Sequence, residues 1–95
     1  MKYGVTHFFP GGTKENYEAS IAAVHPPKGA LPKGQIFHIA GPAPGGWQIV
    51  AVHDSKESWE AFRDGILQPA MAKGIKGGFT SKPTETTFSV HNMVK

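Results

Sequence analysis

The feature that most constrains this chain is a glycine- and proline-rich turn between two apolar segments. The six residues GPAPGG separate QIFHIA (35–40) from WQIVAVH (47–53). β-Branched and aromatic residues favour strands on both sides, and glycine supplies the positive φ of a tight turn. The segment therefore predicts a β-hairpin. A phosphate-binding loop is excluded, because such a loop leads into a helix whose N-terminal amides hold the phosphate, whereas this one leads into a strand.

Proline and glycine also delimit the first strand and helix. Residues 3–9 (YGVTHFF) are aromatic and β-branched and stop at PGG, which predicts a strand. Thr13 is the expected N-cap of a helix that ends before two prolines at 26–27. The apolar face of this helix carries Tyr17, Ile21 and Val24.

A second helix and a last strand follow the hairpin. Asp54 is the expected N-cap, and Glu57 completes a capping box. Pro69 should kink or end this helix near Gln68, with Gly74 as a second stop, and ETTFSVH (85–91) predicts a strand. The apolar stripe of the helix carries Trp59, Phe62 and Ile66.

The resulting order β-α-β-β-α-β predicts an α+β, ferredoxin-like fold with both helices on one face of a four-stranded sheet. We expect 3–9 and 47–53 at its centre as parallel neighbours, each flanked by an antiparallel edge strand. The apolar run IVAV (49–52) requires burial on both faces. A second copy packed sheet to sheet would cover the bare face, so we expect a homodimer.

Composition narrows the class of protein. Ninety-five residues predict a single domain, 1–95. The absence of cysteine excludes disulfides and thiolate chemistry and fits the cytoplasm. Ten Lys and Arg residues are scattered along the chain, so no nucleic-acid partner is expected. No segment is long and apolar enough for a signal peptide or a membrane helix.

Four of the five histidines fall on predicted strands, and His25 ends the first helix. No spacing of the form HxH or HxxxH occurs, so no metal ligand is assigned. If His38 lies opposite Ile49, roughly 13 Å of strand separates it from His53, which excludes a shared metal ion. His7 and His53 should instead meet on adjacent strands, as a general base and its orienting partner. Hydrogen-bonded structural histidines, or ligation of a metal or haem, remain the alternatives.

The other polar residues of interest have structural explanations. Asp54 and Glu57 are better explained as helix caps than as catalysts. Ser55 and Ser58 lack the GxSxG context of a serine hydrolase. Most aromatic side chains should belong to the core.

The segments LPKGQIFHIAGPAPGGWQIVAVHDSKESWEAFRD (31–64) and GFTSKPTETTFSVHN (78–92) resemble the dimeric α/β-barrel superfamily, in an antibiotic-biosynthesis-monooxygenase-like subfamily of unassigned function. The resemblance covers essentially the whole chain. The predicted four-stranded antiparallel sheet has the order 4-1-3-2, and the resemblance implies a homodimeric barrel with an apolar pocket in each protomer. Fold alone does not settle function.

Two functions follow as hypotheses. In the first, the resemblance implies a cofactor-free monooxygenase, cyclase or isomerase acting on a small aromatic or polyketide-like compound. His53 would be the base and His7 its partner; His38 and Trp47 would shape the pocket mouth, and Trp59 and Phe62 would contact the ligand. In the second, the chain is a non-catalytic dimerisation or small-ligand-binding module.

Overall fold

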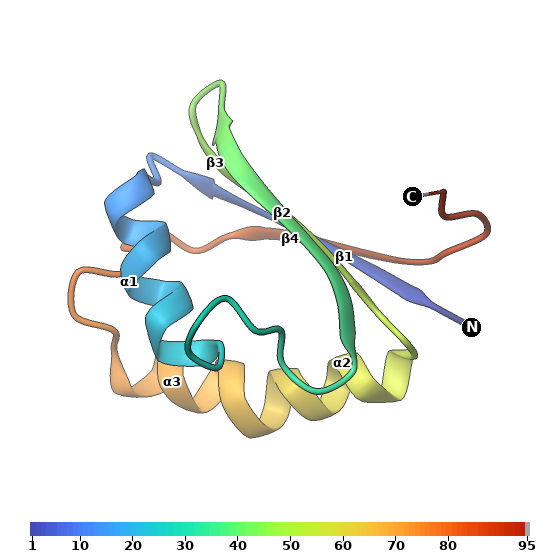
Figure 1. Ribbon diagram of the computed structural model, residues 1–95. Coiled ribbons are helices and arrows are strands. Elements are labelled where there is room, and N and C mark those ends of the chain that lie inside the picture. The colour runs from blue at the N-terminus through green and yellow to red at the C-terminus, as the bar shows by residue number, and fades with distance from the viewer. Residues whose placement is uncertain (95) are drawn as a thin grey trace.

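The computed structural model describes residues 1–94, and its elements follow the predicted order, with the second helix divided into three segments. Both helical regions lie on the same side of the sheet, and the hairpin that contains GPAPGG extends beyond them (Figure 1). In chain order the elements are β1 (Tyr3–Pro10), α1 (Lys14–Val24), β2 (Gln35–Ala43), β3 (Gly46–His53), α2 (Lys56–Phe62), the π-helical segment η1 (Arg63–Leu67), α3 (Gln68–Lys73) and β4 (Thr84–Ser89).

The sheet has the order β2-β3-β1-β4, and every neighbouring pair is antiparallel. This confirms the predicted ferredoxin-like α+β fold and its antiparallel sheet of order 4-1-3-2, read from the other edge. The expectation that the two central strands run parallel is wrong, since Tyr3 lies opposite His53 and Pro10 opposite Gly46. The crossover through α1 makes β1 and β2 parallel, and the hairpin then reverses β3, which lies between them.

The GPAPGG segment forms the predicted hairpin, with β2 ending at Ala43 and β3 starting at Gly46. Gly45 has φ +85°, a conformation that side chains with a Cβ rarely adopt. Gly46 is required for a different reason. A Cβ at this position would collide with the carbonyl oxygen of Phe9 on the neighbouring strand. The turn therefore brings β1 and β3 into close contact at their shared end.

The helix starts are set by capping residues. The side chain of Thr13 accepts a hydrogen bond from the Asn16 amide at 3.1 Å, which confirms the predicted N-cap of α1. The cap of α2 is Ser55 and not Asp54, because the Ser55 hydroxyl accepts from the Ser58 amide at 3.0 Å. A hydroxyl and a carboxylate both serve this role, so the sequence alone did not separate two adjacent candidates.

Pro69 does not end the second helical region. The chain passes through η1 and continues as α3, which ends at Gly74 with φ +87°. Proline lacks an amide hydrogen and its ring crowds the preceding turn of an α-helix. The wider π-turn just before it gives that ring room, so the helical layer runs unbroken along the sheet.

The core lies between the helices and the sheet. The buried cluster consists of Val5 from β1, Val24 from α1, and Trp59 and Phe62 from α2. Tyr3, Leu67, Ala70 and Ile75 pack against it. Within residues 1–94 no helix has the length and apolar character needed to cross a membrane.

Candidate functional site

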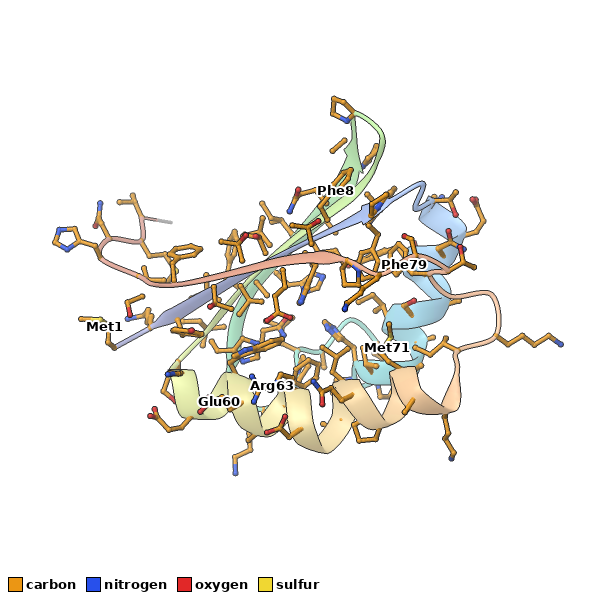
Figure 2. The ribbon with its side chains drawn as sticks, turned by 180° about the vertical axis from the view of Figure 1, so that it is seen from behind. Met1, Phe8, Glu60, Arg63, Met71 and Phe79 are labelled. Atoms are coloured by element: carbon orange, nitrogen blue, oxygen red, sulfur yellow. The ribbon has the colours of Figure 1, made fainter. Side chains whose placement is uncertain are left out.

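A pocket of roughly 170 Å³ lies between the sheet and the helical layer, and all four strands and all helical segments contribute to it. Most of its lining is aromatic or aliphatic. In Figure 2, Met71 lies on the side of the sheet that faces the helices, whereas Phe8 lies beyond the sheet. The polar side chains of the lining include His7, Tyr17, His25, Gln35, His38, His53, Arg63 and Glu85.

Five of the six side chains proposed from the sequence line this pocket: His7, His38, His53, Trp59 and Phe62. Trp47 is buried outside the lining. Its ring packs on Tyr17 with centroids 5.3 Å apart, so it supports a pocket residue from behind. It does not shape the pocket mouth, because it is not among the residues that line the pocket.

His7 and His53 do not meet. His7 lies opposite Ile49, four residues from His53 along β3, which is roughly 13 Å of strand. The Trp59 ring contacts both imidazoles, with centroid distances of 5.8 Å to His7 and 5.4 Å to His53. The expected pairing depended on parallel strands, and the antiparallel register removes it.

The outer wall of the pocket consists of His7 on β1 and Glu85 on β4, which lie opposite each other in register. His7 Nε2 lies 3.1 Å from Glu85 Oε2. A carboxylate accepts hydrogen bonds, so Nε2 carries a proton and donates it. In the neutral imidazole this leaves Nδ1 as a free base. The side chains of His7 and Glu85 are 14% and 42% exposed, so the pair lies at the solvent side of the pocket.

The inner wall consists of Tyr17, His25, Gln35, His38 and His53, and a β-bulge makes it possible. Gln35 lies opposite His53, but Phe37 already lies opposite Val52, so Ile36 is the extra residue. Side chains three positions apart on a regular strand point to opposite faces. The bulge turns Gln35 and His38 to the same face, where they form a hydrogen bond of 2.9 Å.

Four residues of the inner wall form one hydrogen-bonded chain. Tyr17 Oη lies 2.7 Å from His38 Nε2, His38 Nδ1 lies 2.9 Å from Gln35 Oε1, and Gln35 Nε2 lies 3.3 Å from His53 Nε2. The Gln35 carbonyl accepts, so His38 donates from Nδ1 and accepts from the Tyr17 hydroxyl at Nε2. The Gln35 amide donates, so His53 accepts at Nε2. Both imidazoles are neutral in this arrangement.

His53 ends the chain in full burial, with 0% of its surface exposed. Its Nε2 is held by Gln35, and Nδ1 has no hydrogen-bond partner in the described part of the chain. An unpaired buried donor destabilises a fold by about 1–3 kcal/mol.

The register of β2 and β3 places His38 opposite Ala51, not opposite Ile49 as expected, and Gln35 connects His38 to His53. The two flanking histidines of the hairpin belong to one network.

Burial controls the protonation of the inner wall. It lowers the pKa of His25 to about 4, with further lowering by the neighbouring imidazoles of His38 and His53. Burial also lowers the pKa of His38. It lowers the pKa of His53, against an opposing effect of Asp54. The pKa of Tyr17 is raised by burial and by nearby Glu18. All four groups are therefore uncharged near pH 7.

Sequence reasoning missed four polar residues of the two walls: Tyr17, His25, Gln35 and Glu85. The sequence places Tyr17 on the apolar face of the first helix and predicts no role for its hydroxyl. Gln35 begins a strand, and only the bulge turns it toward His38. The antiparallel pairing of β1 and β4, which was predicted, places Glu85 opposite His7, but the register of that pair was not predicted.

Residues 1–94 contain no group of three or more His, Cys, Asp or Glu side chains that could hold a metal ion. The imidazoles of His38 and His53 bond to amide and hydroxyl groups. Their arrangement suits hydrogen bonding and proton transfer.

No family model and no curated protein matches this chain. Two solved structures share its fold. One is designated an antibiotic biosynthesis monooxygenase, from Chloroflexus aurantiacus, with a TM-score of 0.60, 17% identity and coverage of 100% of both chains. The other is a variant of SnoaB, a cofactor-independent oxygenase from Streptomyces nogalater, with a TM-score of 0.61 and 14% identity over 98% of this chain and 95% of that chain. The chain therefore has the ferredoxin-like fold of antibiotic-biosynthesis-monooxygenase-like proteins.

Proposed function

We propose that the chain binds a small aromatic compound in the pocket and removes a proton from it without a bound cofactor. This step is common to cofactor-free oxygenation, cyclisation and isomerisation. The observation that carries the proposal is the His7–Glu85 pair on the wall of a pocket whose lining is mostly aromatic or aliphatic. A carboxylate that holds one ring nitrogen leaves the other oriented as a base.

In the proposed reaction, His7 Nδ1 takes a proton from a phenolic hydroxyl or an activated C–H of the ligand. The electron pair stays on the ligand and is delocalised over its ring. Reprotonation at another atom gives isomerisation, whereas attack on a carbonyl of the same ligand gives cyclisation. Reaction of the anion with dioxygen gives oxygenation, the activity named for SnoaB. His53, covered completely, contributes to the site through Gln35.

The size of the pocket limits the ligand. An apolar cavity of about 150 Å³ in another protein binds benzene. A volume of roughly 170 Å³ therefore suits one aromatic ring with small substituents, with larger parts extending past the solvent side. Trp59 and Phe62 supply aromatic surface for such a ring.

Ligand binding can be tested by tryptophan fluorescence, because Trp59 lines the pocket and Trp47 does not. We expect resorcinol to change the fluorescence of the Trp47→Phe variant, which retains Trp59. The matched Trp59→Phe variant, which retains Trp47, should respond much less. Equal responses of both variants would place the ligand elsewhere.

Proton removal can be tested by the wash-in of deuterium at the activated ring carbons of resorcinol in D₂O, followed by NMR. We expect His7→Gln to slow this exchange by about 100-fold or more. Exposed His91 provides the matched control, and His91→Gln should exchange as the wild type does. Binding without catalysed exchange in the wild type would favour the non-catalytic ligand-binding module.

We also propose that the chain, as one domain, forms a homodimer through the face of the sheet that the helices leave bare. This open face carries Phe8, Phe37, Ile39, Val50 and Phe88, as the register shows. Ile39 is 54% and Phe88 46% exposed in the single chain. A contiguous apolar sheet face of this kind marks an interaction surface.

Light scattering tests the dimer. A homodimer has a mass of roughly 20 kDa, twice the 10.2 kDa of one chain. We expect Ile39→Lys to give a monomer, because it places a charge on the apolar face. Ala40→Lys, also exposed but on the next strand position, should leave the dimer intact. A wild-type monomer at micromolar concentration would contradict the proposal.

A further inference from the structure

The proposed base His7 takes one proton at the outer wall, and the inner wall holds a second group of neutral polar side chains without an assigned role. Tyr17 and His38 both line the pocket, and the Tyr17 hydroxyl donates to His38 Nε2 at 2.7 Å. The lone pairs of that hydroxyl remain available to a ligand. A ligand hydroxyl that donates to Tyr17 would therefore connect to an imidazole base through one intervening oxygen.

The direction of the hydrogen bonds decides whether His38 can accept a proton at Nε2. Gln35 accepts from His38 through Oε1 and donates to His53 through Nε2. If the amide were turned by 180°, every donor in the chain would reverse, and Nε2 of His38 would already carry a proton. The orientation of one amide thus determines the tautomers of two imidazoles.

We propose that Gln35 and His53 are positioning residues that keep His38 protonated on Nδ1, so that His38 Nε2 is a second proton acceptor of the pocket, reached through the Tyr17 hydroxyl. In this step a ligand hydroxyl gives its proton to Tyr17 Oη while Tyr17 gives its own to His38 Nε2. The products are a ligand oxyanion, an unchanged tyrosine and an imidazolium whose Nδ1–H bonds to Gln35 Oε1. The role of Tyr17 and His38 in ligand chemistry rests on the proposed function.

This arrangement defines the ligand more closely. With one acceptor at each wall, the pocket suits a ring that carries proton-donating groups on two sides, such as a dihydroxy-aromatic compound. The groups that face His38 are Tyr17 and His25 of the first helical region, Gln35 of its own strand and, through Gln35, His53 of β3. All are neutral near pH 7, so His38 gains a charge only when it accepts a proton.

The tautomers can be measured without a ligand, by long-range ¹H–¹⁵N NMR of the ¹⁵N-labelled chain. We expect Nδ1 to be the protonated nitrogen in both His38 and His53. The decisive variant is Gln35→Glu, because a carboxylate accepts from both rings and donates to neither. It should leave the proton of His38 on Nδ1 and move that of His53 to Nε2. Gln48→Glu, a matched change on β3 that bonds only to backbone carbonyls, should alter neither ring.

The opposite result identifies the reversed amide. If His53 is protonated on Nε2 in the wild type, and Gln35→Glu moves the proton of His38 instead, the proposal is overturned. Should Gln35→Glu fail to fold, the wild-type tautomers alone decide between the two directions.

The role in proton transfer is tested by the deuterium wash-in of resorcinol. We expect Tyr17→Phe to lower the maximal exchange rate at least tenfold with little change in the half-saturating concentration. Tyr3→Phe, a matched change in the core packing, should have no such effect. A Tyr17→Phe variant with the wild-type rate would overturn the inner acceptor. Loss of exchange in His7→Gln tests the proposed function separately, so the two ideas can fail independently.

Discussion

Both walls of the pocket contain histidine, but the outer wall places it beside a carboxylate and the inner wall places it among buried neutral groups. At the outer wall, His7 has an acidic partner, Glu85, at the edge of the sheet and near solvent. At the inner wall, the imidazoles have only neutral partners and are buried. A carboxylate stabilises an imidazolium, whereas burial destabilises it. The comparison teaches that one pocket can hold an imidazole beside a carboxylate on one side and imidazoles beside neutral groups on the other.

The largest loss of stability should follow from removing the ring of Trp59, which contacts both walls. Trp59 is 3% exposed and contacts both His7 and His53. We expect Trp59→Ala to lower the free energy of unfolding by about 3–5 kcal/mol, because it deletes a core side chain and leaves a cavity. Urea denaturation measures this change. A loss below about 1 kcal/mol would show that packing of the Trp59 ring between the two walls contributes little to the stability of the fold.

Acid should destabilise the inner wall. His25 has a pKa of about 4 in the fold and roughly 6.5 when unfolded, so the unfolded chain binds the proton more tightly. The contribution of neutral His25 to the free energy of unfolding is therefore fully present above pH 6.5. It falls as the pH drops toward 4, by on the order of 3 kcal/mol. His38 and His53, whose pKa values burial also lowers, add to the loss.

Denaturation midpoints between pH 7 and pH 4 test this dependence. His25→Asn should flatten the curve, while His91→Asn, at an exposed site, should leave it unchanged. If His25→Asn has the same pH dependence as the wild type, His25 is not the group that resists protonation.

A smaller effect should come from the end of the hydrogen-bonded chain. Tyr17→Phe removes one hydroxyl and leaves the ring that packs on Trp47. We expect a loss of about 1 kcal/mol in the free energy of unfolding, the net contribution of one hydrogen bond. Thermal denaturation of this variant beside Tyr3→Phe measures it. An unchanged stability would indicate that water replaces the hydroxyl at His38.

The smallest effect on stability should occur at the outer wall. Glu85 is 42% exposed on its side chain, and even a fully charged pair at the surface contributes only about 0.2–1 kcal/mol. We therefore expect Glu85→Gln to leave the stability nearly unchanged while slowing the deuterium wash-in of resorcinol. A larger loss of stability in Glu85→Gln than in Tyr17→Phe would contradict the prediction that the outer wall contributes less to stability than the inner wall.

The sequence predicted the order of elements because Pro, Gly and capping residues mark their ends. Thr13, the GPAPGG turn and Gly74 fulfilled the predicted roles because each acts on its own backbone neighbourhood. The site was harder to predict because it depends on register. A wrong direction for one central strand paired His7 with His53, and Glu85 was overlooked as the true neighbour of His7.

The inner wall could not be predicted from periodicity. A regular strand would place Gln35 and His38 on opposite faces, and only the extra residue at Ile36 brings them together. The sequence QIFHIA gives no local sign of the bulge. Pro69 shows the same limit. Local rules predict a kink or an end of the helix at this residue, whereas the π-helical segment η1 before it lets the helical region continue to Lys73.

That π-turn also has a consequence for how the chain tolerates insertions and deletions. Each residue of an α-helix advances the direction of the side chains by about 100°. Loss of the exposed Gly65 would convert η1 toward an ordinary helix and rotate everything after it by that angle. Met71, now in the pocket lining, would turn away from the sheet, and Pro69 would meet a tighter turn. A single-codon deletion on the surface would thus reshape the interior, whereas the same loss in the loop at 28–31 would not.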